Sequence, residues 1–312
     1  MVNIRIGILC CKKTPENILI HKYLTKKYNT YFLNPTEIEL DLNKNESNIN
    51  LILSRVERDY LQCGLKVLRY IEDNTNVKII NSSKSIEICQ NKYLTYKVLK
   101  EYMPTSLLVS KENFQNIEYL IEEMDLKFPI VVKPVYGGYG NGVLKLDDMK
   151  DLKNIILKKY IINKKENKDL KNKTNKINKN DGKNNNYFIN NNYFNGTIIQ
   201  EYIPYKHDLR VFVINNKIVC VMERIPRNDW RANCSLGAET KLFHLREDIV
   251  DLVLKSIKKT NADIAGVDVL IDKENNPYIL EINITPQFRN IIKYSNIPLE
   301  ILKFIGNISG NN

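Results

Sequence analysis

The first eighty residues alternate between short apolar runs and stretches with a helical period. The apolar runs predict strands at residues 3–10, 31–33, 49–54 and 77–81, and the apolar positions between them predict helices at 18–28 and 60–74. Because strands and helices alternate, we expect a parallel sheet and an N-terminal α/β domain over residues 1–83.

The pattern changes in the middle of the chain. Residues 85–101 predict one helix that carries Lys92 in its interior and ends before Pro104. Residues 113–124 predict another helix, and residues 129–133 predict a strand that Pro134 ends. We assign residues 84–199 to a small central lid subdomain.

Strand patterns dominate the rest of the chain. They are expected at residues 198–202, 208–214, 217–224, 266–271 and 278–282, several of them joined by short turns such as Asn215-Asn216. Residues 248–260 place their apolar side chains on one stripe of a helix. We therefore expect residues 200–312 to form an antiparallel α+β subdomain, so that the chain combines α/β and α+β units.

A low-complexity segment at residues 164–195 interrupts this pattern. Residues 161–196 hold eight Lys and thirteen Asn against three acidic residues, a composition too polar to form a core. This segment carries +5 of the net charge of +11, so the basic excess is not spread over one folded face. Nucleic acid is therefore not the expected partner, although an RNA-binding arm is the alternative for this segment.

Several classes of protein are not indicated. No apolar run is long enough to cross a membrane, and the apolar start is too short for a signal peptide, so we expect a cytoplasmic protein. Six cysteines and three histidines have no zinc-binding spacing, and we interpret the cysteines as reduced, mostly buried thiols. The sequence leaves the oligomeric state open, a homo-oligomer included.

A lysine and a glycine-rich loop are the first candidate binding site. Lys133 ends a predicted strand, and four glycines, Gly138 and Gly140 among them, follow within residues 137–142. The loop matches neither the P-loop nor the dinucleotide fingerprint. Its backbone N–H groups could surround phosphate oxygens while the lysine adds positive charge, but a plain hairpin turn uses glycines too.

Two acidic residues form the stronger candidate. If the hairpin between residues 265 and 283 is centred on Glu274-Asn275, Asp268 lies directly opposite Glu281. Asn283 lies two residues further along and shares the face of Glu281. Like charges at this spacing repel unless one is protonated or a cation lies between them, and three oxygen ligands suit Mg²⁺. The alternative is an exposed hairpin face with solvated acids.

Residues 222–233 are rich in arginine. The guanidinium of an arginine can donate two parallel hydrogen bonds to a carboxylate or phosphate. For any one of these arginines, however, a position in a solvated loop is the plainer interpretation. Trp230 is the only tryptophan and is equally explained as a packing anchor.

The order of these motifs resembles the ATP-grasp ligases over roughly residues 84–290. The resemblance rests on Lys92, Lys133 with its glycine loop, Gln200-Glu201-Tyr202-Ile203, Asp208-Leu209-Arg210, Arg231-Ala232-Asn233, Asp268 and Glu281-Ile282-Asn283. The pieces AGVDVL, LEIN and RANCSLG are most similar to the RimK-type α-L-glutamate ligases. The resemblance implies an ATP-grasp fold in which ATP phosphorylates an acceptor carboxylate and the amine of glutamate displaces the phosphate, with release of ADP.

The resemblance also implies roles for single residues. Lys92 and Lys133, with Gly138 and Gly140, would contact the phosphates of ATP. Gln200, Glu201, Tyr202 and Ile203 would hold adenine at a hinge, and Asp208 would lie at the ribose. Arg231 and Asn233 would act on the transferring phosphoryl group. Asp268, Glu281 and Asn283 would bind Mg²⁺ or Mn²⁺.

The partners implied by the resemblance are ATP, L-glutamate and a polyanionic coenzyme. Relatives in methanogens add glutamate to tetrahydromethanopterin or to the deazaflavin coenzyme. The Asn and Lys bias is typical of an AT-rich genome, and the arginine-rich loop suits both of these polyanionic coenzymes. Between the two, the resemblance alone favours tetrahydromethanopterin. A ribosomal protein or an amino-group carrier protein are the alternative acceptors.

Overall fold

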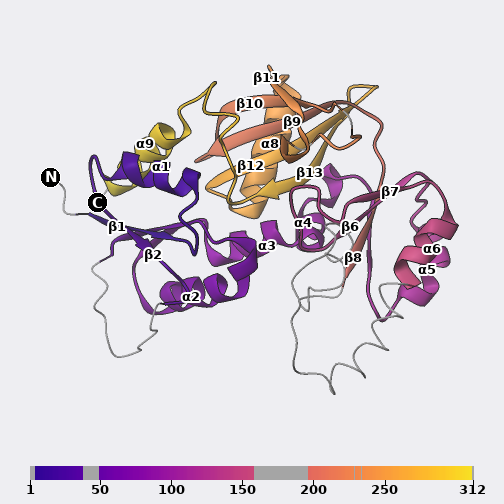
Figure 1. The fold of residues 1–312 in the computed structure, drawn as a ribbon, viewed down its shortest axis with the longest axis horizontal. Coiled ribbons are helices and arrows are strands. Elements are labelled where there is room, and N and C mark those ends of the chain that lie inside the picture. The colour runs from indigo at the N-terminus through magenta and orange to yellow at the C-terminus, as the bar shows by residue number, and fades with distance from the viewer. Residues whose placement is uncertain (1–3, 38–48, 158–195, 228, 233, 311–312) are drawn as a thin grey trace, which may run out of the picture.

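The computed structural model describes residues 4–37, 49–157, 196–227, 229–232 and 234–310. The low-complexity segment at residues 164–195 and the candidate residue Asn233 therefore lie outside the described residues. The strands of the described residues form three sheets, with helices packed against them (Figure 1).

The N-terminal sheet is parallel throughout, as its alternating pattern predicts. Its strand order is β2 (Asn29–Leu33), β1 (Arg5–Leu9), β3 (Leu51–Ser54) and β4 (Lys78–Ile80), with helices α1 (Pro15–Leu24) and α2 (Leu61–Asn74). Helix α1 begins earlier than expected because the Thr14 side chain accepts a hydrogen bond from the N–H of Asn17, and Pro15 fits the first turn.

The second sheet is antiparallel and has its own small core. Its order is β5 (Ser106–Val109), β8 (Thr197–Glu201), β6 (Ile130–Pro134) and β7 (Leu144–Leu146), packed with α5 (Ile117–Glu123) and α6 (Met149–Leu157). The sequence pattern missed β5, β7 and α6, which are too short for a clear period. Pro134 is the last residue of β6 rather than the residue after it.

The predicted helix over residues 85–101 is two helices. Helix α3 (Ser83–Gln90) ends at Asn91, whose extended backbone (φ −102°, ψ 107°) breaks the helix, and α4 (Lys92–Leu99) begins directly after it. The Asn91 side chain caps α4 by accepting hydrogen bonds from the N–H groups of Tyr93 and Leu94 at 3.0 and 3.1 Å. Lys92 is therefore the first residue of a helix and not part of a helix interior.

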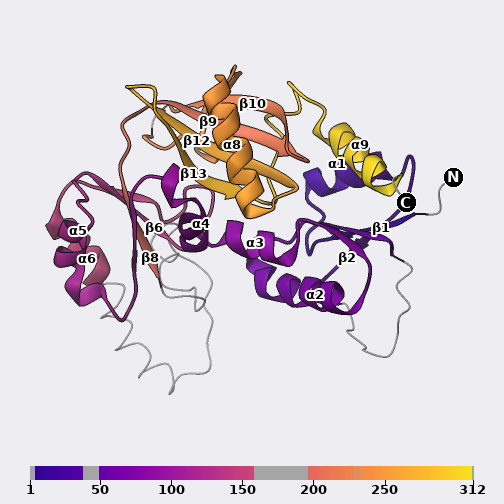
Figure 2. The ribbon, with the colours of Figure 1, turned by 180° about the vertical axis from the view of Figure 1, so that it is seen from behind.

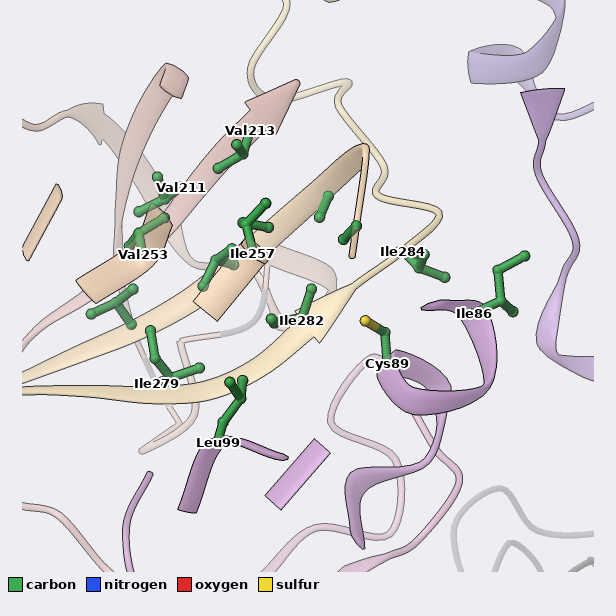
Figure 3. Close-up of a cluster of buried hydrophobic side chains, with 14 of the residues drawn as sticks. Ile86, Cys89, Leu99, Val211, Val213, Val253, Ile257, Ile279, Ile282 and Ile284 are labelled. Atoms are coloured by element: carbon green, nitrogen blue, oxygen red, sulfur yellow. The ribbon is translucent and has the colours of Figure 1, made fainter. Parts of the chain in front are cut away.

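The third sheet is antiparallel, as predicted. Its order is β11 (Glu239–Leu242), β10 (Lys217–Ile225), β9 (Tyr205–Ile214), β12 (Ile264–Asp272) and β13 (Pro277–Asn283), with α8 (Glu247–Thr260) across one face. Figure 3 shows the core under that face, where Val253 and Ile257 of α8 lie among valines and isoleucines of the sheet. Helices α3 and α4 complete this core with Ile86, Cys89 and Leu99.

The end of the chain returns to its beginning. Helix α9 (Ile297–Ser309), which the sequence pattern missed, packs beside α1 (Figures 1 and 2). Phe212 and Ile214, on the other face of the third sheet, share a buried cluster with Ile6 and Ile8 of the first. The core thus runs across the units, and the division at residues 83 and 199 stays a prediction. In the described part of the chain, no helix combines the length and apolar character that membrane crossing requires.

A β-bulge shapes the hairpin that carries the acidic residues. Asp268 pairs with Glu281, as predicted, but the next pair is Val269 with Ile279, so Leu280 is the extra residue. The symmetric register assumed from the sequence is therefore wrong on the turn side of Asp268. Because of the bulge, Ile279 lies in the core, whereas Leu280 and Glu281 both face the pocket described below.

Candidate active site

One pocket lies between the second and third sheets and collects the predicted residues. Its lining includes every described candidate except Asn283: Lys92, Lys133, Gly138, Gly140, Gln200, Glu201, Tyr202, Ile203, Asp208, Arg231, Asp268 and Glu281. Asn283 adjoins the pocket through its hydrogen bond to Glu281.

The acidic residues lie on adjacent strands of the third sheet, with an arginine beside them. Register places Arg210 of β9 opposite Asp268 of β12, and Asp268 opposite Glu281 of β13. Arg210 Nε lies 2.7 Å from Asp268 Oδ1. Asn283 Nδ2 donates a hydrogen bond to Glu281 Oε1 at 3.1 Å. The two carboxylates are thus close together but are balanced by basic side chains.

The pKa values follow from burial and these neighbours. Burial raises the pKa of Asp268, against the opposing charges of Arg210 and Arg224. Burial also raises the pKa of Glu281. The positive charge of Lys92, together with those of Arg210 and Lys133, outweighs this effect and lowers the pKa of Glu281 to about 2. Glu281 is therefore ionised at neutral pH and available as a ligand.

Two lysines also line the pocket near the acids. Lys92 Nζ lies 3.6 Å from Glu281 Oε2 and donates a hydrogen bond to the carbonyl of Gly137 at 2.8 Å. Lys133 is buried and donates to Gln200 Oε1 at 2.7 Å, while Gln200 Nε2 donates to the hydroxyl of Ser106. Burial, followed by the charge of Lys92, lowers the pKa of Lys133 to about 8. Gln200 thus orients a lysine that forms no ion pair with a carboxylate within the described residues.

The glycine-rich loop has the backbone conformation that its sequence requires. Tyr139, Gly140 and Gly142 all have positive φ, at 59°, 72° and 69°. Such left-handed residues turn successive N–H groups toward one side, a geometry that binds anions. Arg231 fixes the loop from across the pocket by donating to the carbonyl of Gly140 at 2.7 Å, while its own charge is paired with Asp229.

The opposite end of the pocket is more apolar. Glu201 ends β8, and residues 202–204 connect the second sheet to the third, as a hinge would. The ring of Tyr202 lies edge-on to that of Trp230, with centroids 6.0 Å apart, and Ile203, Leu270 and Leu280 line the same end. The pocket therefore has an apolar end at the hinge and a charged end at the glycine loop.

The structure adds residues that the sequence interpretation undervalued. Arg224 is not part of a solvated loop: it is buried in β10, where its Nε donates to Asp208 Oδ1 at 2.6 Å and its Nη1 lies 3.4 Å from Asp268. Arg227, by contrast, is exposed and paired with Glu239. The sequence pattern alone could not show that Arg210 and Arg224 are partners of the acids. That follows from the register of β9 with β10 and β12.

The donor set fits a divalent metal that is also bound by a nucleotide. Asp268 Oδ1 is buried and accepts no hydrogen bond, although Arg210 lies close to it. No cluster of three His, Cys, Asp or Glu residues occurs in the described ranges, so two carboxylates and the Asn283 amide oxygen would need further oxygen ligands. Phosphate oxygens supply such ligands for Mg²⁺.

Comparison with known proteins identifies the family of this chain. The RimK-like ATP-grasp domain family matches residues 89–306. The chain belongs to that family. It is accordingly an ATP-dependent ligase that forms a carbon–nitrogen bond.

Individual relatives are distant. The chain is 29% identical to the glutamate–LysW ligase ArgX of Sulfurisphaera tokodaii, over 71% of this chain and 69% of that one. It is 28% identical to the tetrahydromethanopterin:alpha-L-glutamate ligase of Methanocaldococcus jannaschii, over 74% and 69%. Among solved structures, the D-alanine–D-alanine ligase of Bacillus anthracis superposes with a TM-score of 0.66 at 17% identity, covering 97% of this chain and 95% of that one. The last likeness concerns the fold alone.

Proposed function

We propose that this RimK-like ATP-grasp ligase adds L-glutamate to a carboxylate of tetrahydromethanopterin through an acyl phosphate, with release of ADP. The observation that carries the proposal is the pocket itself. It joins an apolar hinge at one end to two lysines, a glycine loop and a buried carboxylate pair at the other.

The residues suit a phosphoryl transfer that needs no protein nucleophile. Lys92, Lys133 and the N–H groups of the glycine loop would neutralise and orient the phosphates, and Arg231 would hold the loop closed over them. Asp268, Glu281 and Asn283 would hold Mg²⁺ or Mn²⁺, which when bound spreads the charge of the phosphates. Asp208 is paired with Arg224, and we propose that it lies at the ribose with Glu201, Tyr202 and Ile203 around adenine.

The names of the relatives support the choice of amine donor and of acceptor. Both relatives reported above are named as ligases of glutamate, which supports glutamate as the amine donor. Their identities to this chain differ by one percentage point, so a carrier protein of the LysW kind is the second candidate acceptor. The relative that is named as a tetrahydromethanopterin ligase supports the coenzyme.

One experiment separates these acceptors. The purified protein is incubated with ATP, Mg²⁺, L-glutamate and each acceptor in turn, and products are analysed by mass spectrometry. We expect tetrahydromethanopterin to gain the mass of a glutamyl residue and the nucleotide product to be ADP. Release of AMP would contradict the acyl-phosphate route, and a glutamyl adduct only on the carrier protein would contradict the acceptor.

A further inference from the structure

An arginine from the N-terminal sheet reaches the glycine loop of the pocket. Arg58 follows β3 at the carboxyl edge of the parallel sheet and opens the short 3₁₀ turn before α2. Its guanidinium lies directly against Gly138, since a Cβ on that glycine would be only 2.5 Å from Nη1 and 2.7 Å from Nη2. The absence of a side chain at residue 138 thus makes room for Arg58.

Arg58 differs from Arg210, Arg224 and Arg231 because no acidic side chain pairs with it in the described part of the chain. Arg210 and Arg224 contact Asp268, and Arg231 contacts Asp229. Within the described residues, Arg58 forms no ion pair, and its buried Nε has no hydrogen-bond partner. A buried donor left in this state is unfavourable unless a ligand satisfies it.

The neighbouring acids are already engaged elsewhere. Glu57 accepts hydrogen bonds from the backbone N–H groups of Cys11 and Lys12 at 2.9 and 2.8 Å, and Asp59 pairs with the side chain of Lys12. Arg58 is also close enough to another cation, Lys92, to act on its pKa: burial lowers that pKa, Glu281 raises it, and the charge of Arg58 lowers it again. Two cations side by side at a glycine loop favour an anion between them.

The position of this anion in the pocket indicates which part of a bound nucleotide would lie next to Arg58. Tyr202 and Ile203 mark the apolar end, which suits a base, while Glu281 and the glycine loop mark the charged end. Lys92 joins Arg58 to that charged end, because its Nζ contacts both the carbonyl of Gly137 and Glu281. The phosphate furthest from the base would therefore lie nearest Arg58.

We propose that Arg58 is a further binding residue for the terminal phosphoryl group of the nucleoside triphosphate, so that the N-terminal unit distinguishes a triphosphate from a diphosphate. This inference rests on the proposed nucleotide site. The planar guanidinium can donate two parallel hydrogen bonds to one phosphoryl group, which lysine cannot do.

Nucleotide binding to Arg58→Gln tests the proposal. Dissociation constants for Mg²⁺·AMPPNP and Mg²⁺·ADP are measured by calorimetry on the parent, on Arg58→Gln and on Arg69→Gln. Arg69 is the matched control, because it is an exposed arginine of α2 paired with Glu87. We expect Arg58→Gln to weaken AMPPNP about tenfold and to change ADP by less than about twofold, with Arg69→Gln like the parent for both.

The outcomes separate the two proposals. If the parent binds neither nucleotide, the proposed function fails. If both bind and Arg58→Gln leaves their affinity ratio unchanged, the role of Arg58 is overturned while the nucleotide site stands. Melting curves of each variant identify any loss of fold.

A second variant tests the same contact from the other side. Gly138→Ala places a methyl group where the guanidinium lies, so it should weaken AMPPNP selectively as well. If it acts through Arg58, adding Arg58→Gln to Gly138→Ala weakens AMPPNP little further, because one interaction cannot be lost twice. Fully additive losses would overturn the proposal.

Discussion

At the scale of single residues, Glu281 is the site residue whose charge has the clearest consequence. The sequence alone suggests that Asp268 and Glu281 repel each other, so that Glu281→Gln would not lower the stability of the metal-free protein. The structure changes this expectation, because Lys92 lies 3.6 Å from Glu281 and lowers its pKa, against the effect of burial, to about 2. Removing the carboxylate leaves the basic side chains without their partner.

We therefore predict that Glu281→Gln lowers the free energy of unfolding of the metal-free protein by about 2 kcal/mol at pH 7. A carboxylate with a depressed folded-state pKa stabilises the fold above its ordinary pKa of 4.5, and this stability is lost as the pH falls toward 2. Urea denaturation at several pH values should show the difference from the parent shrinking below pH 4.5. Glu274→Gln, on the exposed turn of the same hairpin, is the control. A variant as stable as the parent at pH 7 would contradict the account.

The lowered pKa of Lys133 leads to a prediction of how nucleotide binding depends on pH. Its pKa is lowered by burial, and next by Lys92, from 10.5 to about 8, so a growing fraction is neutral above that pH. If phosphates bind the protonated form, the affinity for Mg²⁺·ADP should fall up to about tenfold for each pH unit above 8, with uptake of a proton. Calorimetry in two buffers of different ionisation enthalpy measures both quantities.

Gln200→Glu is the matched test of this pH dependence. It places a carboxylate where Gln200 Oε1 now accepts the hydrogen bond from Lys133, and should shift the fall in affinity to higher pH. An affinity that does not change between pH 7 and 9.5 in either protein would rule out Lys133 as the titrating phosphate ligand.

At the scale of elements, the break between α3 and α4 positions Lys92. Asn91 caps α4 with its side-chain oxygen, and its Nδ2 donates to the hydroxyl of Tyr136 at 3.0 Å. The N–H of Lys92 donates to the carbonyl of Val135 at 3.1 Å, so the helix start is tied to the strand end that leads into the glycine loop. One residue thus ends a helix, starts the next and brings a lysine to the pocket.

We predict that Asn91→Ala lowers stability by about 1 kcal/mol, the usual effect of losing a cap, and weakens Mg²⁺·ADP binding. Asn91→Asp keeps the capping oxygen but loses the donor to Tyr136, so it should keep the stability of the helix start. Thermal denaturation and calorimetry check the two effects. Equal losses in both variants would show that the cap is not the important contact.

At the scale of the whole molecule, Asn81 joins the first sheet to the third. Its side chain donates to the carbonyls of Ile264 and Ile284 at 2.9 and 3.0 Å and accepts from the N–H groups of Asp263 and Ile264. It is buried and has the left-handed backbone conformation (φ 61°) that asparagine tolerates. The N-terminal unit, which carries Arg58, is held in place partly by this residue.

We predict that Asn81→Gly lowers the free energy of unfolding by about 3 kcal/mol, since glycine keeps the backbone conformation but leaves buried polar groups unpaired. Asn261→Gly is the control, because Asn261 is also left-handed (φ 50°) but ends helix α8 on the exposed side. Urea denaturation measures both. A loss shared by the two variants would show that backbone entropy, not the hydrogen bonds, is responsible.

The sequence by itself determined the types of residue at the site and many of the local elements, but not β5, β7, α6, α9 or the break between α3 and α4. The alternation of strands and helices predicted the parallel first sheet, and the strand patterns after residue 204 predicted the antiparallel third sheet. Both predictions work because the hydrophobic period reflects which face of an element is buried. Lys133 with its glycines, and Asp268 with Glu281, stood out because charges within apolar strands need a partner.

Only the tertiary structure decided which charges meet. A symmetric hairpin would pair Val269 with Leu280, but the bulge at Leu280 shifts the register on the turn side of Asp268, so that Val269 pairs with Ile279. Arg224 lines the pocket from β10, Arg210 contacts Asp268 from β9, and Arg58 of the N-terminal unit lies against Gly138 of the glycine loop. The hydrophobic period of one element does not show which residue of another element lies opposite it. Electrostatic interactions depend on distance in space, so the balance of Glu281 by Lys92, 189 positions earlier in the chain, follows only from the fold.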